Sequence, residues 1–295
     1  EKPYLERVRE IVGAFLKDYP GGPLNRVFEP FLKEVDLRLA AIAPFEEFPV
    51  LPDARSRELY VGDLFITVSN KGIEYEGENW LDFNRSFALP SSWKKVAAEL
   101  GKAMDAKEKE RGPENMELIS LRMARDVPMG IAAEIVEMSK SHAPRLVSFA
   151  ARRRMEGISR LTLVGRLRFR EVPIQGRKVS VEGQGTWNCL AIGQSDDTKD
   201  LSAKVDTALI LDASRLMKGS FANGRVVRVE AIETSALQAM AQGSAEHPML
   251  LLVGREVTAD RFLSVLEPLH LRCLDKECNQ IDNLKPRMDV QVCEH

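Results

Sequence analysis

Basic side chains gather in one segment of the chain, from Lys140 to Lys178. Eleven lysine and arginine residues stand there against two glutamates, although the whole chain has a formal net charge of −2. An arginine guanidinium binds a phosphate or carboxylate through two parallel hydrogen bonds. We therefore expect an anion-binding surface, with the candidate contacts Arg152, Arg153, Arg154, Arg160, Arg166, Arg168, Arg170, Arg177 and Lys178.

The spacing within this segment favours a strand. Arg166, Arg168 and Arg170 alternate with apolar residues. Because alternate side chains of a strand point to the same face, three guanidinium groups would leave one face at intervals of roughly 6.6 Å. The opposite face would hold Leu161, Leu163, Leu167 and Phe169. We expect Arg152 to Arg154 at the end of a helix, where positive charge complements the helix dipole.

The sequence leaves three interpretations of this face open. It can bind an anionic partner, with nucleic acid as the first choice. It can be a solvated sheet face whose charge is balanced by carboxylates such as Glu182, Glu230 or Glu233. It can also dock against the acidic N-terminal half, a protein partner or a second copy of the chain. We predict a non-enzymatic binding module for an anionic partner, and as the alternative a subunit of a protein assembly.

Cysteine and histidine residues near the C-terminus raise the question of a metal. His270, Cys273, Cys278 and Cys293 are candidate zinc ligands, although only the His270–Cys273 spacing fits a structural zinc site well. Four cysteines are too few for a disulfide scaffold, so a reducing, cytoplasmic location is expected. In an exported protein, a disulfide between Cys278 and Cys293 is the pairing to expect. No cofactor is predicted.

The enzyme alternative is a metal-dependent nuclease. Asp206 and Asp212 flank the apolar stretch TALIL, and two carboxylates on one strand face could hold Mg²⁺ for phosphoryl chemistry. Other catalytic patterns are missing from the sequence. The stretch GSFANGRV lacks the lysine and hydroxyl of a P-loop, GQG lacks a third glycine, and no nucleophile elbow is present.

Helices are predicted in the first half of the chain. Apolar residues recur at helical spacing over 4–19, and PGGP ends that helix. Further helices are expected over 28–41, from a Ser91 or Ser92 cap to about 111, and over 116–155 with breaks at Pro128 and Pro144. Residues 58–77 alternate with a period of two and predict a hairpin that turns at Asn70–Gly72.

Strands are predicted in the second half, over about 160–169, 178–183, 186–193, 207–213, 224–233 and 248–257. A helix capped by Thr258 follows them. The long first strand with its Gly165 and the late strand NGRVVRVEAIE resemble the pattern of an OB-type barrel. We therefore predict an α+β protein with a helix-rich region and small antiparallel sheet (1–155), a mainly β domain built as a small barrel or sandwich (156–270) and an irregular tail (271–295).

Composition limits the remaining classes. Hydrophobic residues make up 44% and charged residues 29% of 295 residues, as in ordinary soluble domains. No apolar run approaches the roughly 18 residues of a membrane span, so none is predicted. The near-zero net charge excludes a protein that coats nucleic acid with its entire surface. No internal repeat with a period of 20 to 50 residues is present.

Overall fold

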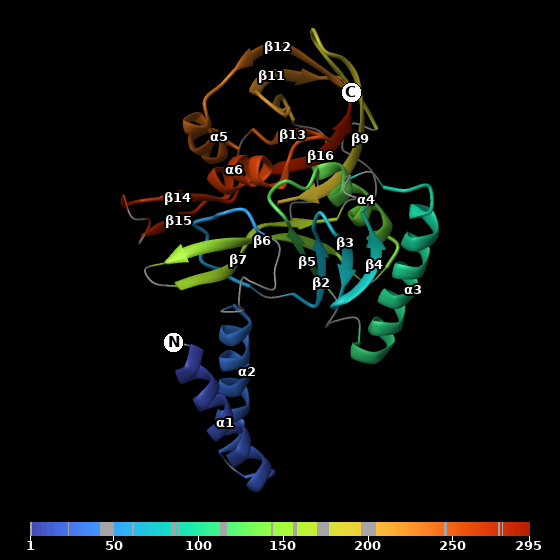
Figure 1. Ribbon diagram of the computed structural model, residues 1–295. Helices are drawn as coiled ribbons and strands as arrows, with labels where there is room; N and C mark the ends of the chain where they lie inside the picture. The colour runs from blue at the N-terminus through green and yellow to red at the C-terminus, as the bar shows by residue number, and fades with distance from the viewer. Residues whose placement is uncertain are drawn as a thin grey trace.

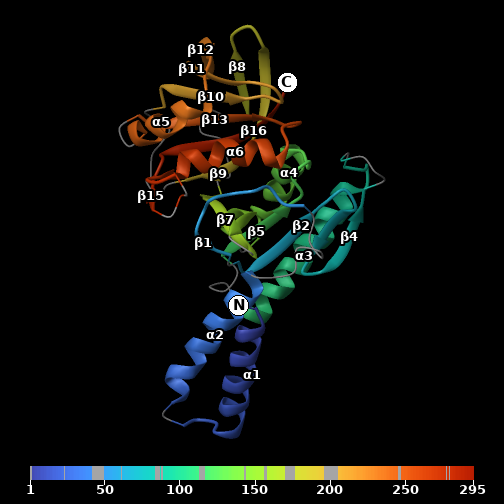
Figure 2. The same ribbon diagram turned by 60° about the vertical axis from the view of Figure 1, so that its left-hand side comes forward.

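The computed structural model describes residues 2–22, 24–41, 50–60, 62–83, 87, 89–112, 117–142, 144–155, 158–169, 177–195, 205–244, 247–276, 278 and 280–295. Within these ranges the chain is a mixed α+β protein with helices in the N-terminal region and a β-rich C-terminal region, which confirms the predicted fold class. Figures 1 and 2 show a helical hairpin that extends from a body built of strands and further helices.

The hairpin consists of α1 (Lys2–Asp18) and α2 (Asn25–Ala41), which pack side by side. Some of the apolar residues that predicted the first helix lie in the seam between the two. Val12 is buried, and the ring of Phe15 lies edge to face with the ring of Phe28 at 5.2 Å between centroids. Both views show the hairpin projecting away from the sheets (Figures 1 and 2).

The first half of the body is a sheet in the order β4-β3-β2-β5-β6-β7. The pairs β2–β5 and β5–β6 are parallel, and the other neighbours are antiparallel. A helix connects β5 to β6 because parallel neighbours need a crossover. The elements of this first half are β2 (Leu64–Val68), β3 (Gly72–Tyr75), β4 (Glu78–Asp82), α3 (Trp93–Arg111), β5 (Leu118–Met123), α4 (Met129–Ser139), β6 (Leu146–Met155) and β7 (Ile158–Arg168).

The second half of the body repeats this spatial order of strands, although its edge strand β9 precedes the other strands in the chain whereas β7 follows them. Its sheet has the order β12-β11-β10-β13-β16-β9, with β10–β13 and β13–β16 parallel and the other neighbours antiparallel. Each strand thus has a counterpart at the same place in the first sheet. Its elements are β9 (Gly185–Gln194), β10 (Thr207–Leu211), β11 (Leu216–Ala222), β12 (Arg225–Ala231), α5 (Leu237–Gly243), β13 (Met249–Gly254), α6 (Ala259–His270) and β16 (Met288–Glu294).

The two halves are joined into one 14-stranded sheet by the pairing of β7 with β9, and they also meet through equivalent turns, the one before α4 and the one before α6. Met129 donates its backbone N–H to the carbonyl of Val257, and Ala259 donates in return to the carbonyl of Val127, both at 2.8 Å. Each of these two bonds becomes the other when the residues of one turn are replaced by their equivalents in the other turn. The turns also share the pattern of arginine, an acidic residue and valine, at Arg125 and again 130 residues later at Arg255. The two turns are therefore related by an approximate local twofold axis, and five strands of each half follow one another in the same order along the chain.

One further strand closes the second sheet. β8 (Lys178–Val181) pairs with β12 on one side and β9 on the other, which makes a closed barrel of seven strands. Trp187, Phe221, Ile210 and Leu252 fill its interior. This confirms the barrel prediction, with seven strands where an OB fold has five. Three short strands lie outside both sheets' main order: β1 (Glu58–Leu59) pairs with β7, and β14 (Leu271–Cys273) pairs with β15 (Ile281–Asn283).

The helical prediction for residues 116–155 is wrong at both ends. β5 and β6 are strands, and only α4 between them is a helix. Central strands of a parallel sheet are buried on both faces, so their nearly continuous apolar sequence lacks the alternation that marks an exposed strand. Arg152 to Arg154 consequently lie in β6 and not at a helix end.

Three smaller expectations are also wrong. The stretch between the predicted strands 207–213 and 224–233, where turn residues at 217–224 indicate a turn, contains β11, and the tail beyond 270, predicted to be irregular, contains β14, β15 and the central strand β16. Ser92 precedes α3 without a side-chain capping bond, whereas Thr258 caps α6 by accepting from Arg261 N as predicted. The predicted division at 155/156 falls inside the β6–β7 hairpin. Whether the two sides fold independently stays a prediction.

A bulge at Gly165 divides β7 into two parts. Phe149 pairs with Val164 and Ser148 with Arg166, so Gly165 is an extra residue between them. Its φ of +64° is left-handed, and a Cβ there would lie 2.6 Å from the side chain of Leu266 in α6. Because the bulge shifts the alternation by one residue, Leu163 and Leu167 point to opposite faces and enter separate apolar clusters. The predicted single apolar face of this strand is therefore wrong.

Among the described residues, no helix is long and apolar enough to cross a membrane.

Candidate functional site

The nine predicted anion contacts do not form one surface. Arg152, Arg154 and Arg166 lie on one face of the β6–β7 hairpin, and we call these three residues the arginine strip. Arg153 and Arg160 are cross-strand partners on the opposite face. Arg177 and Lys178 belong to the barrel, at the start of β8. Arg168 is exposed near the far end of β7, and Arg170 lies outside the described residues.

Carboxylates from the segment before β2 neutralise the arginine strip. Arg152 Nε and Arg154 Nη2 contact the carboxylate of Asp53 at 2.7 and 3.2 Å, and Arg166 Nη2 contacts Glu58 Oε1 at 2.8 Å. Each arginine of the strip therefore has an acidic partner within the same chain. The balancing carboxylates come from a segment about 100 residues away, not from Glu182, which accepts a bond from Arg228 N.

Backbone hydrogen bonds hold this segment in place. Ala54 N donates to the carbonyl of Arg152, Arg152 N donates to the carbonyl of Pro52, and β1 pairs with β7 four residues farther on. Ser56 Oγ donates to the carbonyl of Leu163 at 2.6 Å. Because the segment is bonded to both strands of the hairpin, Asp53 and Glu58 are delivered to the arginine strip in a fixed register.

The electrostatics of Asp53 reflect this pairing. Partial burial raises the pKa of the Asp53 carboxyl, but the hydrogen bond from Arg152 and the charges of Arg152 and Arg154 outweigh burial and lower the pKa below its usual value. The carboxylate is thus stabilised in its charged form. Of the remaining predicted contacts, Arg177 Nη2 pairs with Glu137 Oε1 at 3.4 Å.

The predicted zinc site is not formed. Cys273 is bonded to Cys278, and Cys189 is bonded to Cys293 across β9 and β16. A sulfur in a disulfide is not a thiolate ligand. The expected Cys278–Cys293 disulfide is therefore also wrong. The described residues contain no group of three or more His, Cys, Asp or Glu side chains placed to hold a metal ion.

The imidazole of His270 is buried and hydrogen-bonded to the backbone of its own helix. Its Nδ1 bonds to the carbonyl of Leu266 at 2.9 Å in the last turn of α6. Burial lowers the pKa of this imidazole, although the bond to Leu266 partly opposes the shift. The ring is therefore stabilised in its neutral form.

The two aspartates of the nuclease alternative are far apart. They lie at opposite ends of β10, six residues and roughly 20 Å along the strand. Asp206 Oδ2 contacts His247 Nδ1 at 3.1 Å, whereas Asp212 accepts bonds from Ser214 N and Arg215 N in the turn to β11. Each aspartate thus has a local partner, and the pair cannot share one metal ion.

The helical hairpin has an apolar face that the sequence analysis did not single out. Ile11 in α1 and Val27 and Phe31 in α2 are 56%, 62% and 46% exposed. Their helical positions place all three on the same side of the α1–α2 seam, and we call them the hairpin face. The opposite side of the seam is closed by an ion pair between Arg9 and Asp36 at 2.9 Å.

The hairpin as a whole is where exposed apolar residues concentrate. Tyr19 and Leu24, at its tip, are also exposed, so five of the eight large exposed apolar side chains found in the described residues lie on it. The sequence signal for this exposed face is the width of the apolar stripe in residues 5–16. A helix that packs on one neighbour needs a narrower apolar stripe.

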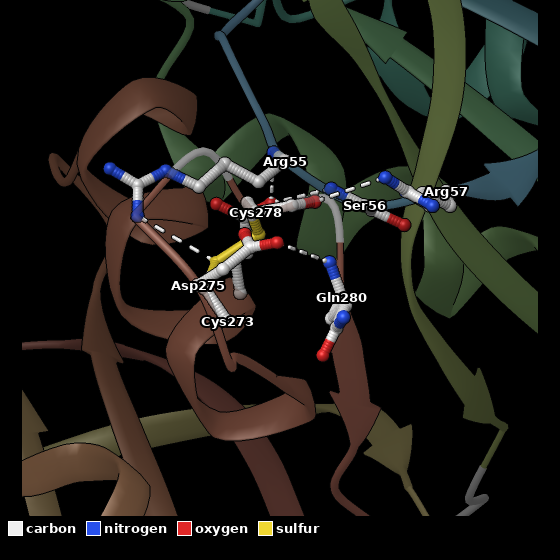
Figure 3. Close-up of a disulfide and its surroundings, with 8 residues drawn as sticks. Arg55, Ser56, Arg57, Cys273, Asp275, Cys278 and Gln280 are labelled. Carbon is white, nitrogen blue, oxygen red and sulfur yellow. Dashed lines mark hydrogen bonds between the residues drawn. A yellow bond between two sulfur atoms is a disulfide. The ribbon is translucent and has the colours of Figure 1, made fainter.

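A cleft of about 610 Å³ lies between the start of β1, the Gly165 bulge and the β14–β15 ribbon. Its polar lining includes Arg57, Ser195, Asn283 and Lys285. Figure 3 shows Arg57 reaching toward the loop closed by the Cys273–Cys278 disulfide, where its Nη2 donates to the carbonyl of Cys278 at 3.2 Å.

Comparison with known proteins finds no family model, no curated protein and no solved structure that matches this chain.

Proposed function

We propose that the protein is an assembly module that self-associates through the hairpin face. The observation that carries this proposal is the exposure of Ile11, Val27 and Phe31 on one side of a hairpin that projects from the body. A contiguous apolar patch on an otherwise polar surface is typical of an interaction site.

A second copy of the chain is the occupant that fits this face. Two hairpins packed face to face form a four-helix bundle, in which the second row of apolar residues becomes a core. The two helices contain seven basic and six acidic residues, so their near-zero net charge creates little repulsion between identical copies. Each helix has 17 residues and is about 25 Å long, enough for several turns of contact.

The pairing of the arginine strip favours protein assembly as the proposed function and makes nucleic-acid binding the second choice. Its three guanidinium groups already have carboxylate partners, and a phosphate would have to displace Asp53 or Glu58. Counterion release is correspondingly smaller for cations that are paired within the protein. Nucleic-acid binding through this strip stays a prediction.

We also propose that the protein works in an oxidising compartment. Disulfides join all four of its cysteines, and such pairing persists where thiols are not kept reduced. This proposal replaces the cytoplasmic expectation. Mass spectrometry of the native protein after thiol alkylation should show no alkylated cysteine.

Sedimentation velocity over a concentration series tests the assembly. The wild type should shift from monomer to dimer, and a Val27→Ser/Phe31→Ser variant should stay monomeric. Val227→Ser is the matched control, because Val227 is an exposed apolar residue on the barrel and not on the hairpin. A wild type that stays monomeric throughout, or a control that dissociates as much as the hairpin variant, contradicts the proposal.

A further inference from the structure

The two disulfides differ in how closely the fold surrounds them. Cys189 and Cys293 are 2% and 1% exposed, and their disulfide joins the neighbouring strands β9 and β16. Cys273 ends β14 and is partly exposed, although its partner Cys278 is buried. A reductant can therefore approach Cys273 in the folded chain, whereas we expect the other disulfide to become accessible only when the pairing of β9 with β16 opens.

An arginine side chain lies beside the accessible disulfide. Arg55 Nη1 is 3.8 Å from Cys273 Sγ, and Figure 3 shows the guanidinium next to this sulfur. The backbone of the arginine is fixed, because the N–H groups of Arg55 and Ser56 both donate to Glu267 Oε1 in α6. A guanidinium next to a sulfur favours the thiolate, and a more stable thiolate leaves a disulfide faster. Arg55 is thus positioned to promote thiol–disulfide exchange at Cys273.

The same disulfide fixes the loop that holds Arg57. Cys278 has a φ of +56°, a left-handed conformation that is costly for a residue other than glycine. Its carbonyl accepts the bond from Arg57 Nη2 at 3.2 Å, as Figure 3 shows. Once the bond between the sulfurs is broken, Cys278 is free to leave the left-handed region and to turn its carbonyl away from Arg57. Because Arg57 lines the cleft described above together with Leu271 and Ile281 of the β14–β15 ribbon, reduction would change the lining of that cleft.

We propose that Cys273–Cys278 is an exchangeable disulfide, which an external dithiol reduces while the chain stays folded. A thiolate of the dithiol bonds to Cys273 Sγ, the bond between the two protein sulfurs breaks, and its electron pair leaves on the Cys278 sulfur, which takes a proton from water. The second thiol of the dithiol loses its proton to water and attacks the first, which displaces Cys273 as a thiolate beside Arg55. This thiolate takes up a proton in turn.

The exchange balances as a two-electron transfer. The dithiol is oxidised to a disulfide, and the protein disulfide is reduced to two thiols. In the oxidising compartment proposed above, the disulfide is the resting form of the protein. The exchange site lies on the body and is independent of self-association through the hairpin face.

Timed reduction followed by mass spectrometry tests the exchange. The folded protein is incubated with dithiothreitol at neutral pH, and the thiols present at successive times are trapped with N-ethylmaleimide. Cys273 and Cys278 should be alkylated at least about 100-fold faster than Cys189 and Cys293, because only the second pair needs an opening of the barrel. Circular dichroism of the same samples should show that the chain stays folded while the first pair reacts.

A substitution of Arg55 separates the proposed chemistry from simple exposure. Arg55→Gln should slow the reduction of Cys273–Cys278 about three- to tenfold, the effect expected of one charge about 4 Å away at an exposed site. Arg272→Gln is the matched control. Arg272 is an exposed arginine next to Cys273 in β14, and its side chain points to the opposite face of the ribbon.

Hydrogen exchange measures the consequence for the cleft. In protein reduced only at Cys273–Cys278, the amides of residues 271–276, 280–283 and 55–58 should exchange faster than in the oxidised protein, whereas those of the central strand β13 should not change. The proposal is overturned if both disulfides are reduced at equal rates, if reduction occurs only in unfolded protein, if Arg55→Gln slows it no more than Arg272→Gln does, or if exchange around the cleft is unchanged.

Discussion

Replacing Phe31 by serine should dissociate the proposed dimer without unfolding the chain. Phe31 lies on α2 and is 46% exposed, so its outer edge is free to contact a second hairpin. Phenylalanine and serine have similar helix propensities, and the substitution removes little that is buried within one chain. The folded monomer should therefore keep its circular dichroism spectrum.

The size of the effect follows from the exposed area. A phenylalanine side chain buries about 200 Å², so 46% exposure leaves about 90 Å² for the interface. At about 25 cal/mol per Å², this area contributes about 2 kcal/mol in each copy. A symmetric dimer contains the residue twice, which gives about 4 kcal/mol and roughly a 1,000-fold weaker dimer.

Sedimentation velocity measures this change directly, over protein concentrations from about 0.1 to 100 µM, which bracket dissociation constants in the micromolar range. Val227→Ser removes a comparably exposed side chain from β12 and should leave the dissociation constant unchanged. A loss of less than about tenfold for Phe31→Ser would place the residue at the rim of the contact or outside it, and would refute the face-to-face packing.

Three further substitutions test the fold. Gly165→Ala should destabilise the protein by about 2–4 kcal/mol in urea unfolding, because a left-handed φ and the clash with Leu266 act together. Gly183→Ala is the control, because Gly183 has a similar φ in open space, and it should cost only about 1–2 kcal/mol. Equal losses would show that the clash is relieved. Asp53→Asn should cost at most about 1 kcal/mol at neutral pH. Because the folded pKa of Asp53 is lowered, its contribution is present above the ordinary value of 3.8 and is lost as pH falls through the folded pKa, so wild type and variant should converge in acid and in high salt; a pH-independent difference would contradict the ion pairs. Removing the Cys189–Cys293 disulfide, which spans 104 residues, should destabilise the protein by about 4–5 kcal/mol through loop entropy. Removing the Cys273–Cys278 disulfide, which spans five residues, should cost about 2 kcal/mol. The reverse order in thermal unfolding would show that the short loop contributes through its contacts with Arg55 and Arg57.

The sequence alone determined the elements whose pattern has a clear period. The helical spacing of residues 4–19 places α1, and the strands β7, β8, β9, β10, β12 and β13 lie close to their predicted bounds, whereas β11 was missed. These signals are local, because a helix or a half-buried strand sets its own period of 3.6 or 2. The segment of high positive charge is also a property of the sequence, and its strand conformation in β7 followed from Arg166 and Arg168.

Tertiary structure decided what that charge contacts. Asp53 and Glu58 reach the arginine strip only because the chain before β1 is bonded to both strands of the β6–β7 hairpin, about 100 residues away. The bulge at Gly165 lies against Leu266 of α6, and it moves the downstream side chains to the other face. The apolar runs of β5 and β6 fit a buried helix as well as a buried strand until their neighbours are known. Local pattern fixes an element's type where one face meets water, whereas pairing across long separations fixes which face, which partner and which charge it receives.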